Sequence, residues 1–363
     1  MTDIYNYEKK QEKQTLIEAD TGKRSKEQFV ENLREGDAVN DYFAVKIKNP
    51  PRQYKKGFWF DFMARDKTGE IMVKYWGGEN KDRIKRLYDS FSIGDVVQVR
   101  TGYVETYEER PQISINESTG GIRRCNPKEY DVADFITAID AKKIQELYTY
   151  IQKQIKTIKN QQLSNLLDLF FKDPAFVEKY THSPSAMTHH HNYVGGNLEH
   201  TVGTVRLCVN ICEMYPNIDK EILLTGAILH DVGKLKEYTG ETTVDRTELG
   251  NFIGHIVIGD RWIQEKITEL RKNGKPFDQT LENKLHHLIL SHHGKHEWGS
   301  PVIPKTVEAQ ILHFADLMDS QVKNYIQNIE NAHKATDDTW SSVYDSNLKK
   351  KRMIYLGESE SKK

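Results

Sequence analysis

The sequence predicts a multidomain protein in which a small all-β barrel is followed by an all-α helical bundle. Three observations support this fold class. The chain has 363 residues, more than one hydrophobic core usually serves. Short alternating apolar segments separated by turn residues occupy the front part, and apolar residues at helical spacing occupy the rest. We expect a charged arm at 1–35, the barrel at 36–128, the bundle at 129–335 and a charged tail at 336–363.

Five short segments in the front part alternate apolar and polar residues, as half-buried strands do. Turn residues separate them at 49–51 (Asn-Pro-Pro), 66–69 (Asp-Lys-Thr-Gly) and 93–95 (Ile-Gly-Asp). A polar helical stretch at 79–91 falls between the third and fourth segments. Five short strands in this order match the plan of an OB-fold barrel. The predicted strands are 42–47, 57–62, 70–76, 96–100 and 112–115.

The rear part is predicted to be helical. Apolar residues recur at helical spacing in one series from Ile144 to Ile158 and in another from Leu198 to Cys212. The Asp173-Pro174 and Ser183-Pro184 steps should interrupt helices, because the residue before a proline avoids the helical conformation.

Both ends of the chain are rich in charge. We expect residues 1–35 to form a helical or loosely ordered arm, and the lysine-rich end from residue 349 onward to be frayed. The N-terminal segment lacks the apolar stretch of a secretion signal, and no apolar run is long enough to span a bilayer. The three cysteines include no CxxC pair, and Cys208 and Cys212 are read as small buried side chains. These features predict a cytoplasmic protein with no membrane partner.

Histidine is distributed unevenly along the chain. All 14 histidines lie between His182 and His333. Histidine is the commonest metal ligand and a frequent acid or base, so the chemistry should reside in the rear part.

The most informative segment is the run of residues 228–234, Ile-Leu-His-Asp-Val-Gly-Lys. Adjacent residues on a helix point about 100° apart, so His230 and Asp231 can reach one cavity only at a helix end or from a wide buried face. A carboxylate can bridge two cations, whereas a neutral imidazole binds one. Lys234 follows one helical turn after His230 and can meet a phosphate as a point charge.

Further candidate ligands occupy apolar surroundings on separate predicted helices: His200, His255, His292, His293 and Asp316. Taken singly, each histidine could be a satisfied core residue, and Asp316 could cap a helix. Taken together they favour a metal site, because buried polar groups need partners and a shared cation supplies them.

The ordered series His, His-Asp, His, His, Asp over roughly 180–325 resembles the HD superfamily of metal-dependent phosphohydrolases. The resemblance implies that His200, His230, Asp231 and Asp316 hold one divalent ion. Asp231 would bridge to a second ion held by His255 and by one or both of His292 and His293. Where only one of this pair binds metal, the other would contact substrate, and we expect His293 to make substrate contacts. The resemblance further implies a metal-bound hydroxide as nucleophile. The ligand types suit manganese, iron, cobalt, nickel or zinc.

The segment 188–196 begins with three consecutive histidines just before the first ligand helix. His190 and His191 could bind phosphate at the mouth of the site, and His191 could protonate a leaving oxygen. The alternative is a surface loop that is merely polar.

The predicted barrel combines cations with aromatic residues. Residues 36–128 contain 17 Lys and Arg against 13 Asp and Glu, although the whole chain carries a net charge of −1. Aromatic faces can stack unpaired bases while cations follow the backbone. Strand alternation should bury Phe58, Phe60 and Phe62 and expose Trp59, whereas the alternative is that the aromatics simply fill the barrel core. We expect substrate contacts from Lys56, Trp59 and Trp76.

A barrel followed by this helical series is similar to the YhaM-type 3′→5′ exoribonucleases. The resemblance rests on Trp76 and Gly94-Asp95 in the barrel, and on 189–201, 230–234, Gly254-His255, 291–294 and 299–301 in the rear part. It implies trimming of single-stranded RNA, and also of single-stranded DNA, from the 3′ end with divalent metal, often manganese.

Two other functions stay open at this point. One is an HD phosphodiesterase or phosphatase acting on small or cyclic nucleotides, in which the barrel regulates or oligomerises. The other is a non-catalytic single-strand-binding protein with an inactive HD fold. A homo-oligomer is compatible with all three hypotheses.

Overall fold

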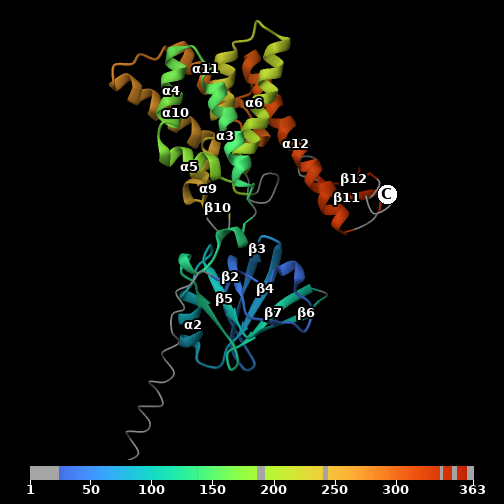
Figure 1. The fold of residues 1–363 in the computed structure, drawn as a ribbon. Helices are drawn as coiled ribbons and strands as arrows, with labels where there is room; N and C mark the ends of the chain where they lie inside the picture. The colour runs from blue at the N-terminus through green and yellow to red at the C-terminus, as the bar shows by residue number, and fades with distance from the viewer. Residues whose placement is uncertain are drawn as a thin grey trace, which may run out of the picture. The chain divides into compact units, whose positions relative to one another are not determined.

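The computed structural model describes residues 24–108, 110–136, 138–185, 193–239, 244–335, 338–345 and 350–357 (Figure 1). The chain divides into two compact units between residues 136 and 137. Residues 129–136, which the sequence placed with the bundle, belong to the front unit. The reason is packing, because the buried rings of Tyr130 and Phe135 join the cluster around Tyr42 and Val96.

The front unit contains each of the five predicted strands and the predicted helix α2 (Lys81–Asp89). Three short strands that the sequence did not reveal complete its sheet: β1 (Ala38–Val39), β6 (Gly102–Tyr107) and β8 (Gly121–Arg124). The predicted strands are β2 (Tyr42–Tyr54), β3 (Gly57–Asp66), β4 (Gly69–Trp76), β5 (Val96–Arg100) and β7 (Arg110–Asn116).

The strand order is β1-β6-β7-β4-β3-β2-β5-β8, with β4 and β7 parallel and the other pairs antiparallel. Strands β5 and β6 lie toward opposite ends of this order, yet only Thr101 separates them in the chain. Thr101 takes a left-handed backbone conformation with φ of 52°, so the fourth predicted strand bends there and brings the two ends of the sheet together. The helix α2 lies between β4 and β5, which are the third and fourth predicted strands. This topology confirms the predicted OB-fold barrel.

The interior of the barrel follows the predicted alternation at Phe60 and Phe62, whereas Phe58 is only partly buried, against the edge of the same cluster. Phe60 and Phe62 are fully buried with Phe43, Val73 and Ile113, and this apolar burial holds their strands together.

One predicted turn was wrong. The prolines at 50 and 51 lie inside β2, and the chain reverses at Lys55 and Lys56 instead. Because proline cannot donate to a neighbouring strand, the register with β3 shifts between Asn49 and Arg52. The prolines therefore produce a bulge in a long strand.

Residues 24–35, the described part of the expected N-terminal arm, pack on the barrel. Lys26 is buried, donates a hydrogen bond to the Tyr42 carbonyl at 2.6 Å, and lies 3.7 Å from Asp41 and 3.5 Å from Asp66. A charged segment thus becomes ordered because the barrel offers its lysine two buried carboxylates.

The rear unit is a bundle of helices, as predicted. Seven of them begin after a side chain that accepts a hydrogen bond from a first-turn amide, the usual helix N-cap. These caps are Asp140, Asn160, Asp173, Asp219, Thr247, Asp278 and Thr306. The principal helices are α3 (Ala141–Ile155), α4 (Gln161–Phe171), α5 (Pro174–His182), α6 (Gly196–Met214), α7 (Lys220–Leu229), α8 (Lys234–Glu237), α9 (Glu248–Ile253), α10 (His255–Lys272), α11 (Gln279–Ser291) and α12 (Val307–Ala335).

The helix interruptions occur at the two predicted proline steps. Helix α5 begins at Pro174 and ends at His182, one residue before Ser183-Pro184. Helix α6 packs against α12, α7, α3 and α5, and Leu198, Val205 and Cys208 are buried along it.

The charged tail is more ordered than expected. Residues of β11 (Trp340–Asp345) and β12 (Lys350–Tyr355) form an antiparallel hairpin at the end of the long helix α12 (Figure 1). Ile354 and Leu356 are buried against Ala332 of that helix. The expectation of a frayed end was therefore wrong for the residues of β12, because its alternate apolar side chains cover α12.

No helix among the described residues has both the length and the apolar character needed to cross a membrane.

Candidate metal centre

A helix end brings His230 and Asp231 into one cavity. Helix α7 ends at Leu229, His230 caps it, and Asp231 lies in the turn before α8 begins at Lys234. A Cβ at Gly233 would overlap the His255 carbonyl and lie 2.7 Å from the Gly259 amide nitrogen. The glycine therefore lets α10 pack against this turn, which positions His255 beside Asp231.

The remaining candidate ligands come from four more elements of the bundle. His200 lies in the second turn of α6 and His255 is the first residue of α10. His292 directly follows α11, with His293 next to it, and Asp316 projects from α12. Residues separated by more than 100 positions in the sequence thus meet at one place.

One half of the centre contains His200, His230, Asp231 and Asp316. The His200 Nε2 atom lies 3.1 Å from Asp316 Oδ1 and 3.4 Å from Asp231 Oδ2. His230 Nε2 lies 3.2 Å from Asp231 Oδ2 and 3.3 Å from His200 Nε2. Ligand atoms of His200, His230 and Asp231 all lie within 4.8 Å of one another, close enough to share a cation.

The other half contains His255, His292 and His293, whose ligand atoms also lie within 4.8 Å of one another. His255 Nε2 lies 3.4 Å, and His292 Nε2 3.8 Å, from Asp231 Oδ1. The two oxygens of Asp231 therefore face different halves, the arrangement expected of a bridging carboxylate.

Each of the five histidines has its Nδ1 nitrogen already engaged. His230, His292 and His293 donate from Nδ1 to the carbonyls of Ala227, Ile289 and Trp298 at 2.8, 2.6 and 2.7 Å. For the other two histidines the acceptors are carboxylates: Asp319 Oδ2 lies 2.7 Å from His200 Nδ1, and Glu237 Oε2 lies 2.9 Å from His255 Nδ1. Because carbonyls and carboxylates only accept, Nδ1 carries a proton in each ring, and Nε2 is the nitrogen available to a metal ion.

Three buried atoms in this centre have no hydrogen-bond partner among the described residues: Asp231 Oδ1, His255 Nε2 and His292 Nε2. Leaving a buried polar atom without a partner costs about 1–3 kcal/mol. All three are electron-pair donors directed at one another, so divalent cations would satisfy them together. The residues present therefore fit a pair of divalent metal ions.

The electrostatics of the centre agree with this fit. Burial raises the pKa of Asp231, but the Lys234 ammonium together with His230 and His255 outweighs burial and holds that pKa well below its usual range, so the carboxylate is ionised. Burial lowers the pKa of both His292 and His293, which keeps them as the neutral imidazoles that bind metal. Burial also lowers the pKa of His200, but hydrogen bonding to Asp316 and Asp319 raises it to about 10. Without a cation His200 is thus an imidazolium, and a metal ion would replace its Nε2 proton.

Lys234 lies at the rim of the centre with its side chain 12% exposed. Its ammonium donates to Asp231 Oδ2 at 2.6 Å and to Ser185 Oγ at 3.1 Å. The predicted phosphate-binding residues His190 and His191 lie outside the described residues.

Sequence reasoning missed three side chains of this centre: Asp319, Glu237 and Ser185. The two carboxylates did carry a signal, because Asp319 follows Asp316 by three residues on a helix and Glu237 follows Lys234 by three. Those spacings place each of them on the same helix face as a residue already singled out.

The outer face of the barrel gathers aromatic rings around a lysine. The rings of Trp59 and Trp76 lie 5.7 Å apart, and Tyr54 meets Trp76 edge-on at 5.1 Å. Lys74 Nζ lies 5.1, 5.3 and 5.0 Å from the rings of Trp59, Trp76 and Tyr107. Trp59 is half-buried rather than exposed because Trp76 covers part of it, and Lys56 is exposed at the β2–β3 turn.

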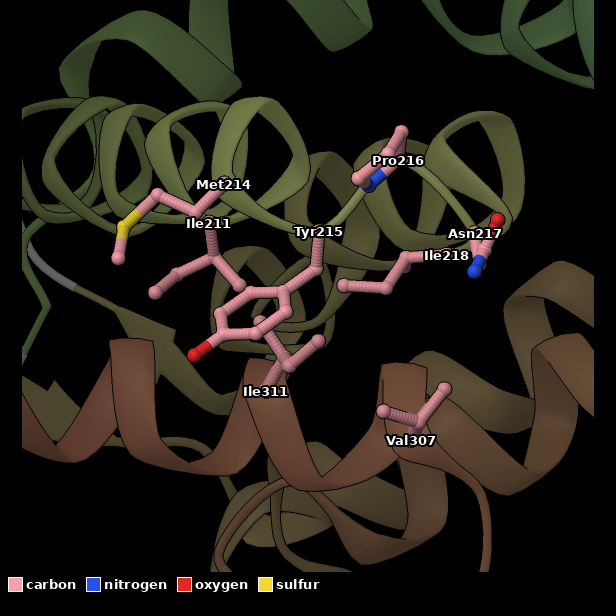
Figure 2. A pocket seen from close by; sticks show the side chains of 8 residues that line it. All are labelled: Ile211, Met214, Tyr215, Pro216, Asn217, Ile218, Val307 and Ile311. Atoms are coloured by element: carbon pink, nitrogen blue, oxygen red, sulfur yellow. The ribbon is translucent and has the colours of Figure 1, made fainter.

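A separate hollow of about 510 Å³ lies at the other end of α6 (Figure 2). Its lining begins at Ile211, 11 residues beyond His200 and about 17 Å along the helix. Apolar side chains dominate its lining, and it contains none of the candidate ligands. The lining residues are Ile211, Met214, Tyr215, Pro216, Asn217, Ile218, Val307 and Ile311.

Comparison with known proteins identifies the family of the helical unit and then the family of the chain. The HD domain family matches residues 197–321, which include the ligands from His200 to Asp316. The HD domain implies dependence on divalent metal. The 3′-5′ exoribonucleases YhaM of Listeria welshimeri and of Bacillus subtilis are each 31% identical to this chain over 290 residues, covering 79% of it and 86% of their own length. The chain belongs to the YhaM family of 3′-5′ exoribonucleases.

A solved structure also matches the front part. The replication factor A related protein from Methanobacterium thermoautotrophicum covers 28% of this chain and 91% of its own at 20% identity, with a TM-score of 0.24. That score is too low to argue from, so the barrel assignment rests on strand order.

Proposed function

We propose that this protein is a metal-dependent exonuclease that hydrolyses phosphodiester bonds of single-stranded RNA, and of single-stranded DNA, from the 3′ end. One observation carries the proposal: the two oxygens of the Asp231 carboxylate face different clusters of ligand atoms. The chain that shows this arrangement belongs to the YhaM family.

We assign one ion to His200, His230, Asp231 and Asp316, and the other to His255, His292, His293 and the second oxygen of Asp231. Manganese suits this mixture of imidazole and carboxylate ligands, as do iron, cobalt, nickel and zinc. When bound, a pair of such ions lowers the pKa of water and neutralises charge on the phosphate.

The protein's own side chains have three tasks in this scheme. Asp231 holds the two halves of the centre at a fixed separation. Lys234, whose ammonium lies at the rim beside Asp231, provides a cation for the scissile phosphate. His190 and His191 are assigned to the phosphate and His191 to protonation of the leaving oxygen, because their segment immediately precedes the ligand helix α6.

The barrel is assigned the task of holding the strand. The rings of Trp59 and Trp76 would stack on unpaired bases, and Lys56 would meet the backbone. Lys74, which lies against both indole rings, and Tyr107, whose ring lies beside Lys74, extend the same surface. The YhaM relatives and the three buried, unpaired cysteines favour a cytoplasmic enzyme.

The test is a product ladder. Full-length protein loaded with Mn²⁺ is incubated with a 5′-labelled single-stranded RNA and with the DNA of the same sequence. Progressive shortening of the labelled strand, one nucleotide at a time, is expected for wild type and absent for Asp231→Ala. Turnover of cyclic dinucleotides without any ladder would favour a small-nucleotide phosphodiesterase instead, and binding without any cleavage would favour a non-catalytic binder.

A further inference from the structure

Two carboxylates outside the candidate ligand set, the half-buried Asp319 and the buried Glu237, each contact one histidine, in a different half of the centre. We propose that Asp319 and Glu237 are positioning residues, which fix His200 and His255 so that each presents Nε2 to its ion. We also propose that Gly203 and Gly250 are small in order to leave room for them. The inference rests on the proposed metal centre. It adds that Asp319 controls the ion held by His200 and that Glu237 controls the ion held by His255.

Asp319 secures the half that contains His200. It projects from α12 one turn after Asp316, and its Oδ2 lies 2.7 Å from His200 Nδ1. Asp316 lies on the opposite side of the same ring, 3.1 Å from Nε2. If Asp316 and Nε2 both turn to a cation, Asp319 keeps its contact with Nδ1 and still sets the tautomer and the ring plane.

Glu237 secures the other half. It is the last residue of α8, its side chain is 2% exposed, and its Oε2 lies 2.9 Å from His255 Nδ1. Arg246 lies 3.4 Å from its other oxygen and balances its charge. Because α8 begins three residues after Asp231, one short segment supplies both the bridging carboxylate and this outer partner.

The histidines that receive these carboxylates differ from the other three in the acceptor that lies beside Nδ1. His230 and His292 each donate to a carbonyl three residues earlier in the chain, so the end of α7 or α11 orients them, and His293 donates to the Trp298 carbonyl. His200 lies inside α6 and His255 opens α10, and beside the Nδ1 of each lies a carboxylate from another helix.

The glycines give independent evidence for the same arrangement. A Cβ at Gly203 would overlap the Asp319 carboxylate and lie 2.7 Å from its Cγ. A Cβ at Gly250 would overlap the Glu237 carbonyl and lie 2.9 Å from the Glu237 Cγ. Glycine inside a helix such as α6 is less favourable than alanine, so its presence at position 203 requires an explanation. The explanation is that Gly203 leaves space for the Asp319 carboxylate.

The experiment measures Mn²⁺ binding to the full-length protein by calorimetry and equilibrium dialysis, apart from any activity. Wild type is expected to bind two ions. Asp319→Ala and Glu237→Ala should each weaken one ion by about 10–100-fold and leave the other within about twofold. Gly203→Ala should reproduce the effect of Asp319→Ala. The exposed carboxylates Glu330 on α12 and Glu265 on α10 provide matched controls as Glu330→Gln and Glu265→Gln.

A double-mutant cycle separates positioning from general damage. If Asp319 acts through His200, adding Asp319→Ala to His200→Ala should cause no further loss of Mn²⁺ affinity, whereas Asp319→Ala and Glu237→Ala should combine to weaken both ions. If Asp319→Ala does not fold, Asp319→Asn decides the matter, because it keeps the shape and an accepting oxygen but removes the charge. It should weaken one ion relative to wild type and leave the other within about twofold.

Two results would overturn the inference. Wild-type affinity for both ions in Asp319→Ala and Glu237→Ala would refute the positioning roles and leave the metal centre standing. A wild-type chain that takes up no divalent ion would refute the proposed centre and the positioning roles together.

Discussion

Replacing Trp59 tests whether the barrel grips the strand. In Trp59→Ala the barrel loses one of two neighbouring indole rings, while Trp76 keeps its hydrogen bond to Ser114 Oγ at 3.0 Å and its edge contact with Tyr54. The change therefore removes one stacking platform and leaves the other in place. One base–aromatic stack contributes about 1–3 kcal/mol, and 1.4 kcal/mol corresponds to a tenfold change in Kd. The Kd for single-stranded RNA should rise about 5- to 150-fold.

The assay is fluorescence anisotropy of a 5′-labelled RNA with full-length protein in EDTA, so that binding is read without cleavage. Trp340→Ala is the matched control, since Trp340 is 53% exposed on the C-terminal hairpin. Hydrolysis of a small phosphodiester by the Mn²⁺-loaded protein should be the same in wild type, Trp59→Ala and Trp340→Ala. An RNA Kd for Trp59→Ala within twofold of both wild type and Trp340→Ala would refute the role given to this face.

Three further changes test other parts of the account. Asp231→Asn should lower Mn²⁺ affinity by more than the ~10–100-fold typical of an outer partner and abolish cleavage; two tightly bound ions in this variant, measured by dialysis, would rule out a bridging role. Gly233→Ala should destabilise the bundle by about 1–3 kcal/mol through overpacking against α10 and weaken the ion at His255; an unchanged urea midpoint would contradict the close approach seen there. Phe60→Ala, at a fully buried position in the barrel, should reduce the free energy of unfolding by about 3–5 kcal/mol, and a loss below 1 kcal/mol would mean that the ring is not in a core.

Much of the fold could be predicted because the local pattern and the tertiary environment agree. Strand alternation identified the five main strands, and Phe60 and Phe62 are buried as the period of two requires. The short strands β6 and β8 could not be recognised in the same way. They depend on pairing with distant partners, and β6 exists as a separate strand only because the backbone bends at Thr101.

The predictions that were wrong have a common physical origin in distant contacts. Pro50 and Pro51 read locally as a turn, but the long β2 absorbs them as a bulge paired with β3. The C-terminal segment reads as charged and frayed, but Ile354 finds an apolar surface on α12. In both cases the segment pairs or packs with another element, β3 or α12, which the local sequence pattern does not indicate.

The position of a candidate site residue could be predicted only where its neighbours in the sequence restrict where its side chain can lie. The adjacent His230 and Asp231 limit the site to a helix end or a wide buried face, and α7 ends at Leu229. Nothing in the sequence pairs His200 with Asp319, which lies 119 residues away, or indicates that Gly203 makes room for it.

The most direct test of the central claim is a crystal structure of the Mn²⁺-loaded protein with anomalous data collected at the manganese edge. The account predicts two peaks about 3.5–4 Å apart, one on each side of the Asp231 carboxylate, the first beside His200 and the second beside His255. A single peak, or peaks that do not touch Asp231, would contradict it.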